Sequence, residues 1–122
     1  MDNFDANIPI YVQIIQNIKE KIVTGSLVPG DKLPSVREHS ESLSVNPNTV
    51  QRSYQELERE GVTETRRGLG TYIVEKDGLI EQLKAEMAEM LLKQFIDGMH
   101  SLGFKDDIIP SILHKALQGG NQ

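Results

Sequence analysis

The chain contains 122 residues, of which 38% are hydrophobic and 25% are charged, and its formal net charge is −5. This length and composition allow one modest domain with an appendage, and the absence of cysteine excludes disulfides and cysteine-ligated metal centres. Because no apolar run approaches the roughly 18 residues of a membrane helix and the start MDNFDANIP lacks signal-peptide features, we expect a soluble, cytoplasmic protein without a membrane partner.

The first predicted element is a helix that follows a short polar start, residues 1–8, which we expect to be loose. Pro9 suits the first turn of this helix, and Gly25 is placed to end it. Its apolar stripe consists of Tyr11, Ile14, Ile15, Ile18 and Ile22. The turn signal Pro29–Gly30 then predicts a short strand or an extended connector over Leu27–Leu33.

Two helix starts follow close together. Ser35 and Glu38 match a capping box, which predicts a short helix to about Leu43. The positions that we expect this helix to bury are Val36, Ser40 and Leu43. Asn46–Pro47 provides an N-cap residue followed by proline, so a second helix is predicted from here to near Gly61.

The second of these helices has two distinct faces. Val50, Tyr54 and Leu57 recur at helical spacing and predict a buried stripe. The polar face consists of Asn48, Gln51, Arg52 and Gln55. Asn and Gln can pair with adenine and Arg with guanine, while Ser35 and Arg37 of the preceding helix are placed to reach phosphate or base. Taken alone, a plain helical hairpin with a solvated face explains this pattern about equally well.

A basic hairpin follows the helix pair. Val62–Arg66 and Thr71–Val74 are predicted strands, and Arg67–Gly70 joins them as a tip. The residues that suit a narrow groove, through arginine charge or close backbone approach, are Arg66, Arg67, Gly68 and Gly70. By itself the hairpin fits an ordinary tight turn. Together with the helix pair it favours a DNA-binding winged helix-turn-helix.

The end of the chain predicts two more helices, over Asp77–Leu102 and Asp107–Leu117, with Pro110 in the first turn of the second and a frayed tail after it, residues 119–122. Packing onto the winged domain of the same chain is one interpretation of their apolar faces. Because a two-helix appendage would expose a large apolar patch, dimerisation is the favoured one. The residues expected to form that interface are Leu83, Met87, Leu91, Phe95 and Met99. The predicted fold is therefore mostly α with a small β-hairpin (α+β), with a winged helix-turn-helix domain over residues 1–76 and a two-helix dimerisation region over 77–122.

No catalytic constellation is present in the sequence. We expect His39 on an exposed or half-buried helix face, and the spacing of His39, His100 and His114 does not suggest a metal site. No nucleophile motif, phosphate loop or paired catalytic carboxylate stands out. We therefore expect neither an enzyme nor a cofactor or metal.

The charge distribution argues against simple electrostatic adhesion to nucleic acid. The first 76 residues contain nine Lys and Arg against eleven Asp and Glu, and the remainder contains four against seven. Any contact with DNA must therefore come from local placement of cations, with the acidic residues turned away from the phosphates.

Several runs resemble the GntR family of bacterial winged helix-turn-helix regulators. They are Pro9–Ile14, Leu33–Glu38, Val45–Val50, Leu57–Gly61 and Arg67–Thr71. The resemblance covers about Pro9–Val74, and the short tail resembles the YtrA-like branch, whose members are small dimers with genes commonly beside those of ABC transporters. Departures from the family pattern are His39–Ser40 in place of Leu-Ala, Thr63 in place of an apolar residue, and Leu69 at the wing tip.

The resemblance implies a role for individual residues. Arg37 would contact DNA from the first helix of the pair. The start of the recognition helix would contribute Asn46, Pro47, Asn48, Thr49 and Gln51, and the wing would contribute Arg67, Gly68 and Gly70. We expect a homodimeric repressor that binds double-stranded DNA at a palindromic operator, with a transporter operon as a suggested target. Two alternatives stay open: a winged-helix protein-interaction module, which the acidic charge favours, and a metabolite or metal sensor acting through the last helices. About 45 residues are too few for a conventional ligand pocket, so any effector is unknown and would bind at the dimer interface.

Overall fold

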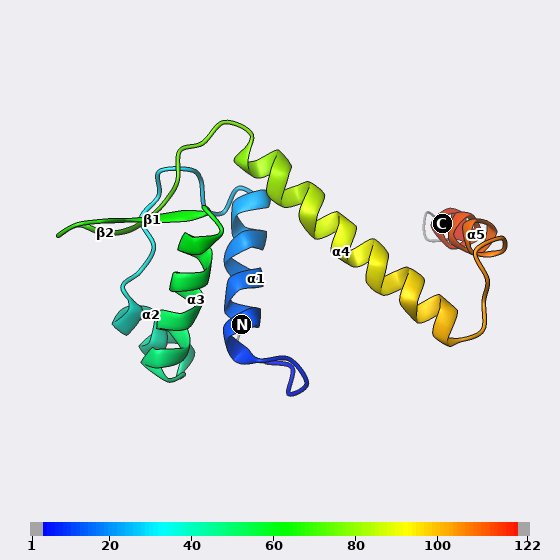
Figure 1. Ribbon diagram of the computed structural model, residues 1–122, viewed down its shortest axis with the longest axis horizontal. Coiled ribbons are helices and arrows are strands. Elements are labelled where there is room, and N and C mark those ends of the chain that lie inside the picture. Colours follow the sequence, from blue (N-terminus) through cyan, green and yellow to red (C-terminus); the bar gives the residue numbers. More distant parts are fainter. Residues whose placement is uncertain (1–3, 120–122) are drawn as a thin grey trace. The chain divides into compact units, whose positions relative to one another are not determined.

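The computed structural model describes residues 4–119. The elements follow in the order α1 (Ile10–Val23), α2 (Val36–Leu43), α3 (Pro47–Arg59), β1 (Thr63–Arg66), β2 (Gly70–Ile73), α4 (Leu79–Ser101) and α5 (Ile109–Gly119) (Figure 1). This confirms a mostly helical fold with one small hairpin and a helical tail. The first three residues and most of the expected frayed tail, residues 120–122, lie outside the described residues.

The segment before α1 differs from the expected loose start. The side-chain oxygen of Gln13 accepts a hydrogen bond from the backbone N–H of Asp5 at 2.8 Å, and its amide nitrogen donates to the carbonyl oxygens of Asp5 and Ile8 at 2.8 Å. Residues 5–8 are therefore tied to the first turns of α1. Sequence patterning cannot find this, because it depends on one polar side chain turning back over the preceding loop.

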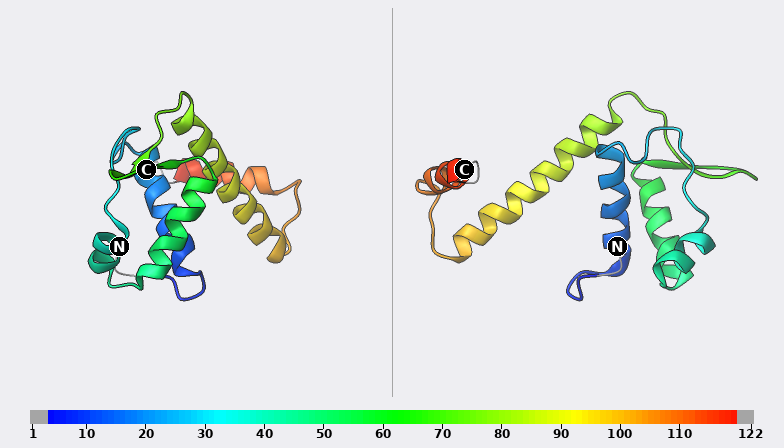
Figure 2. Two further views of the ribbon diagram at one scale, coloured as in Figure 1. Left: turned by 60° about the vertical axis from the view of Figure 1, so that its left-hand side comes forward. Right: turned by 180° about the vertical axis from the view of Figure 1, so that it is seen from behind.

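The core of the first unit lies between α1 and α3, which run side by side (Figure 2). The predicted stripes of both helices are buried except for Tyr11, which is partly buried and packs against the core. The buried hydrophobic residues are Ile14, Ile15, Ile18, Ile22, Leu33, Val50, Tyr54, Leu57, Val62, Ile73, Leu79 and Leu83. Both stripes follow the helical period, so each helix turns one apolar face inward. Val36 and Leu43 of α2 are only partly buried and pack against this core.

Local hydrogen bonding sets the ends of the helices. The capping box between Ser35 and Glu38 is formed at the start of α2, and the Asn46 side chain accepts a bond from the backbone N–H of Asn48 at the start of α3. At the end of α3, Gly61 has φ +79°, and the N–H of Val62 donates to the carbonyl of Leu57 at 2.9 Å. This arrangement is a Schellman motif, which requires a left-handed residue that glycine adopts without a Cβ penalty.

The connector before α2 joins the hairpin as an extended segment. β1 and β2 pair antiparallel, with Thr65 opposite Thr71, and Lys32 forms an isolated antiparallel bridge with Tyr72. Backbone bonds of 2.8 Å run from Gly30 to Ile73 and from Leu33 to Thr71. The predicted connector therefore lies along β2, and it fixes where the chain enters α2.

The chain divides into two compact units, and the division falls inside α4, between Leu83 and Lys84. The sequence predicts a boundary after residue 76, where the helical pattern of the tail begins. The first turns of α4 belong to the first unit because Leu79 and Leu83 are buried in its core. Leu83 is only 2% exposed, so its side chain is not free to contact a partner in the way expected from its place in the apolar stripe.

The second unit contains most of α4 and all of α5. α4 continues through Gly98 and ends where Gly103, at φ +93°, forms another Schellman motif with the N–H of Phe104 donating to the carbonyl of Met99 at 3.1 Å. Pro110 lies in the first turn of α5, as predicted. Among the described residues, no helix has the length and apolar character needed to cross a membrane.

Candidate nucleic-acid interface

α3 separates its buried and exposed faces clearly. The four residues of the predicted polar face, Asn48, Gln51, Arg52 and Gln55, are all exposed. Sequence reasoning missed Ser53, which is fully buried and donates from its hydroxyl to the carbonyl oxygens of Tyr11 at 2.9 Å and Thr49 at 3.1 Å. A small residue at this position lets α3 approach α1 closely, and the bond to Tyr11 fixes the two helices against each other.

Arg52 has a defined position on the exposed face. Its guanidinium carbon lies 3.8 Å from the centroid of the Tyr11 ring. A cation over an aromatic face is attracted by the ring quadrupole, by about 0.5–1 kcal/mol at an exposed site. The stacking places Arg52, the cation of the polar face, beside the start of α1. Because the stacking energy is small, the Arg52 side chain can still turn toward a ligand.

The start of α2 presents a cation and an anion side by side. Arg37 is 87% exposed in its side chain and lies 3.2 Å from Glu41, a surface pair of little energetic worth. Glu38 is held by the capping box, and hydrogen bonds from the backbone and side chain of Ser35 lower the pKa of its carboxyl group. The ionised Glu38 complements the positive end of the helix. The N–H of Ser35 donates to the Glu38 carboxylate and the N–H of Glu38 donates to the Ser35 hydroxyl, so both groups are already engaged.

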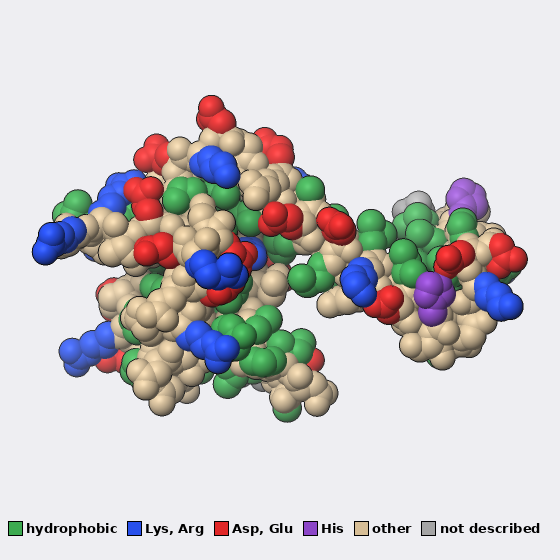
Figure 3. Space-filling model, in the orientation of Figure 1, with side chains coloured by type: hydrophobic (Ala, Val, Ile, Leu, Met, Phe, Trp, Pro, Cys, Tyr) green, Lys and Arg blue, Asp and Glu red, His purple; other side chains and the backbone are tan. Residues whose placement is uncertain are grey.

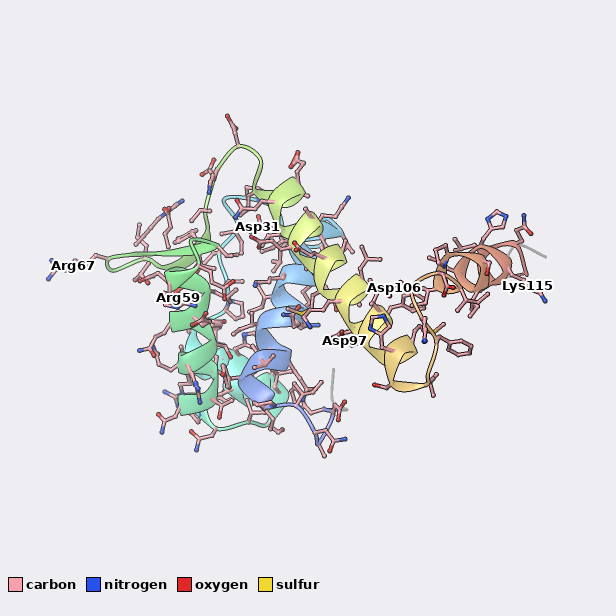
Figure 4. The ribbon with its side chains drawn as sticks, turned by 45° about the vertical axis from the view of Figure 1, so that its right-hand side comes forward. Asp31, Arg59, Arg67, Asp97, Asp106 and Lys115 are labelled. Carbon is pink, nitrogen blue, oxygen red and sulfur yellow. The ribbon has the colours of Figure 1, made fainter. Side chains whose placement is uncertain are left out.

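The two arginines of the hairpin differ in their surroundings. Arg67 lies at the tip and points away from the rest of its unit (Figure 4). Arg66 lies over the Tyr72 ring at 4.1 Å and pairs with Glu64 at 2.9 Å and Glu75 at 3.7 Å. Arg66 is thus held by its own hairpin, whereas Arg67 is available to a ligand. Gly68 and Gly70 have φ of +77° and +119°, so both positions need the freedom of glycine.

Acidic and basic side chains are interspersed over the first unit (Figure 3). Four of the cations have carboxylate partners: Lys19 with Glu60, Arg37 with Glu41, Arg59 with Glu56, and Arg66 with Glu64 and Glu75. Within residues 4–83, no ion pair is formed by Lys21, Lys32, Arg52, Arg67 or Lys76. A net negative unit therefore still carries local unpaired positive charge, including Arg52 on α3 and Arg67 on the wing.

His39 is buried, which corrects the expectation of an exposed or half-buried position. Its Nδ1 lies 2.7 Å from the hydroxyl of Tyr54, and that hydroxyl donates to the carbonyl oxygen of Pro34 at 2.7 Å. The two rings meet edge to face, with centroids 5.7 Å apart. Because the single hydroxyl proton goes to Pro34, Nδ1 of neutral His39 carries a proton and donates to Tyr54. This chain of bonds joins α2, α3 and the connector.

Acidification is expected to destabilise the fold through His39. Burial, with a smaller effect of Lys21, lowers the pKa of His39 below its ordinary value of 6.5. The unfolded chain then binds the proton more tightly, so the free energy of unfolding should fall as the pH drops below about 6.5, by at most about 1.4 kcal/mol per pH unit. Urea denaturation between pH 7.5 and 5.5 measures this slope. His39→Leu should flatten it and His114→Gln, at an exposed site, should not; an equal slope in all three proteins would contradict the assignment.

The described part of the chain contains no cluster of three or more His, Cys, Asp or Glu residues placed to hold a metal ion. His100 instead contacts Asp106, and His114 lies 3.0 Å from Gln118. The candidate site is the exposed surface made by α2, α3 and the hairpin, whose side chains offer hydrogen-bonding groups and charge.

A helix–turn–helix with an exposed polar second helix, followed by a hairpin with an arginine at its tip, defines a winged helix-turn-helix protein. Residues 10–73 match the family described as "Bacterial regulatory proteins, gntR family". The chain belongs to this family, and it is a DNA-binding transcriptional regulator.

Two curated relatives and one solved structure are similar over most of their length. The chain is 46% identical over 114 residues to the HTH-type transcriptional regulator YhcF of Bacillus subtilis, covering 92% of this chain and 94% of the relative. It is 52% identical over 100 residues to the HTH-type transcriptional repressor YtrA of the same organism, covering 80% and 76%. A GntR family transcriptional regulator from Listeria monocytogenes has a TM-score of 0.80 at 45% identity, covering 92% and 98%.

Proposed function

We propose that the protein is a repressor that binds a palindromic operator as a homodimer, with α3 in the major groove and the hairpin wing at the adjacent minor groove. The observation that carries this proposal is the exposed polar face of α3 in the same compact unit as the exposed Arg67. The relative YtrA is named a transcriptional repressor, which supports the direction of control. Repression would follow from occlusion of the promoter, in the cytoplasm where bacterial DNA lies.

The proposed DNA contacts divide by chemistry. Base readout comes from the exposed side chains of α3, where Gln51 and Arg52 have the reach and hydrogen-bonding groups to distinguish base pairs. Positioning contacts to phosphate come from the helix starts and the wing. These are Ser35, Arg37, Asn46 and Thr49 at the helix starts, and Arg67, Gly68 and Gly70 at the wing. Pro47 has no N–H and offers only backbone-carbonyl and apolar contact, and Asn48 belongs to the base-reading face of α3. Gln55 extends the reading face of α3, and Arg66 orients the wing through its contact with Tyr72.

The homodimer is supported by the apolar surface of the second unit. The large hydrophobic residues exposed there are Met90, Leu91, Leu92, Ile96, Leu102, Phe104, Ile108, Leu113 and Leu117. An apolar surface of this extent on a small unit is a mark of an interaction site. A second copy of this chain is the occupant that we propose, because a twofold dimer presents two α3 helices to two half-sites of a palindrome.

Replacing Gln51 or Arg52 by Ala is expected to relax base preference at one position in each half-site. Loss of a good side chain–base pair costs about 1–3 kcal/mol of discrimination. Selection of sites from a randomised duplex pool, carried out with each variant and with the wild type, measures this preference. The reason for expecting a local effect is that each side chain reaches only one or two base pairs.

Arg59→Ala is the matched control, because Arg59 is also an exposed arginine of α3 but lies in its last turn, paired with Glu56. Its selected sites should equal those of the wild type. If Gln51→Ala and Arg52→Ala also select the wild-type sequence, α3 does not read bases through these residues and the proposed orientation is wrong.

A further inference from the structure

Lys32 occupies a defined place between the wing and the start of α2. Its backbone forms the antiparallel bridge with Tyr72, in the middle of β2. Leu33 follows it with a 2.8 Å backbone bond to Thr71, and the chain then enters α2 at Ser35. The position of Lys32 is therefore set by hydrogen bonds to the wing on one side and by the capped helix start on the other.

The side chain of Lys32 crosses the wing at Gly70. A Cβ atom at Gly70 would lie 2.8 Å from Cε of Lys32, which is closer than real Cβ contacts allow, and 3.6 Å from its Nζ. The absence of a side chain at Gly70 thus leaves the space through which the lysine stem passes. Its ammonium group is carried toward the tip end of the wing, where Gly70 follows the turn and begins β2.

The ammonium group of Lys32 is available to a ligand. Lys32 is exposed and forms no ion pair among the described residues. The neighbouring cation of the hairpin, Arg66, is held by Glu64 and Glu75. The hydrogen bonds from Ser35 are the main cause of the lowered pKa of Glu38 on α2, and the positive charge of Lys32 adds a smaller effect in the same direction.

We propose that Lys32 binds a backbone phosphate of the DNA strand that separates the groove occupied by α3 from the groove occupied by the wing. This inference rests on the proposed function, which places α3 and the wing in adjacent grooves. The phosphate strand between the grooves then runs beside the wing, and Lys32 is tied to the wing through its bridge with Tyr72. A lysine is a compact, flexible charge suited to phosphate contact, and such a contact positions the protein without reading sequence.

The salt dependence of DNA binding tests the proposal. The probe is a duplex selected by the wild-type protein from a randomised pool, and binding is titrated at several concentrations of KCl. Lys32→Met keeps an unbranched apolar stem beside Gly70 and removes the charge. It should make the slope of log K against log salt shallower by about 0.9 for each chain bound, and weaken binding to all sequences alike. Lys32→Arg keeps the charge and should retain the wild-type slope.

Lys115→Met removes the same charge from α5 and should leave the slope unchanged. A methylphosphonate placed at the contacted phosphate should weaken the wild type but not Lys32→Met, because the two changes remove one interaction. If Lys32→Met has the wild-type slope, the phosphate contact is wrong, whereas the proposed function still stands. A shift in base preference without a change in slope would overturn the phosphate contact in the same way. If the wild type selects no duplex at all, the proposed function and the Lys32 contact are both wrong.

Discussion

Replacing Leu91 by Asp is expected to convert the proposed homodimer into monomers and to weaken operator binding by roughly a hundredfold or more, because two linked half-site contacts become independent. Leu91 lies in the middle of α4 and is 66% exposed within its own chain. A carboxylate forced into an apolar interface would lose its hydration without a partner. Sedimentation velocity and titration of the selected duplex measure the two effects.

The exposure of Leu91 also makes this test specific. Because the side chain contributes little to the packing of its own chain, the substitution should leave the fold of the monomer nearly unchanged, as helical circular dichroism would show. Glu89→Asp is the control, because Glu89 lies on the opposite side of α4 from Leu91. This replacement also introduces the poorer helix former Asp, but it keeps the charge, and the protein should remain dimeric. A Leu91→Asp protein that sediments as the wild-type dimer would remove Leu91 from the interface. A monomeric wild type would refute the homodimer itself.

Replacing Leu57 by Ala is expected to lower the free energy of unfolding by about 2–5 kcal/mol. Leu57 is fully buried in the core, and its carbonyl accepts the bond that closes the end of α3. Truncation removes apolar contact and leaves a cavity, because packed interiors relax only in part. Against a typical stability of 5–15 kcal/mol for a whole domain, a loss of this size would leave a substantial unfolded fraction on mild heating.

Urea unfolding monitored by circular dichroism measures the effect, and Gln55→Ala provides the comparison. Gln55 lies two residues earlier on the exposed face of α3, so its replacement should change stability by less than about 0.5 kcal/mol. Should the two variants unfold at the same urea concentration, the assignment of Leu57 to the core would be wrong.

Most of the winged domain could be predicted from the sequence because its signals are local. Helical spacing gave the buried stripes of α1 and α3, and the residue pairs Ser35–Glu38 and Asn46–Pro47 marked both helix starts. Arg67–Gly70 likewise marked the hairpin tip. In each case a few residues close in the chain decide the backbone conformation, so that tertiary contacts only reinforce what the sequence pattern already specifies.

The features that were missed depend on contacts distant in the chain. Burial of His39 requires Tyr54, 15 residues away, as a hydrogen-bonding partner, although the family pattern of an apolar residue at this position was a usable signal. Ser53 is buried because its hydroxyl reaches Tyr11, 42 residues away. Lys32 carries no motif, and its place beside the wing follows only from the pairing of the connector with β2.

The division of the chain inside α4 was missed for a different reason. An uninterrupted helix gives no composition change at the point where one unit ends, so the sequence suggested a boundary at its beginning. The burial of Leu79 and Leu83 shows that the first turns of α4 complete the core of the winged unit. α4 is thus shared by the two units that the proposed function assigns to DNA binding and to dimerisation.

Several cations of the acidic first unit lack carboxylate partners and lie where contact with DNA is proposed. The first 76 residues are net acidic, and four of their nine cations are paired with carboxylates. The unpaired Lys32, Arg52 and Arg67 belong to the connector, the recognition helix and the wing, which are the elements proposed to meet DNA. Binding that relies on so few contacts should depend more on base readout and dimerisation than on charge, and should show a modest salt slope.

Sequence-specific repression by a dimer is tested by a footprint of the wild-type protein on the DNA upstream of its own gene at physiological salt. We expect protection of a site with twofold symmetry, occupied by two chains, with major-groove contacts in both half-sites flanked by minor-groove contacts. Absence of any protected site, or binding that random duplex removes equally well, would contradict sequence-specific repression and favour a protein-interaction module.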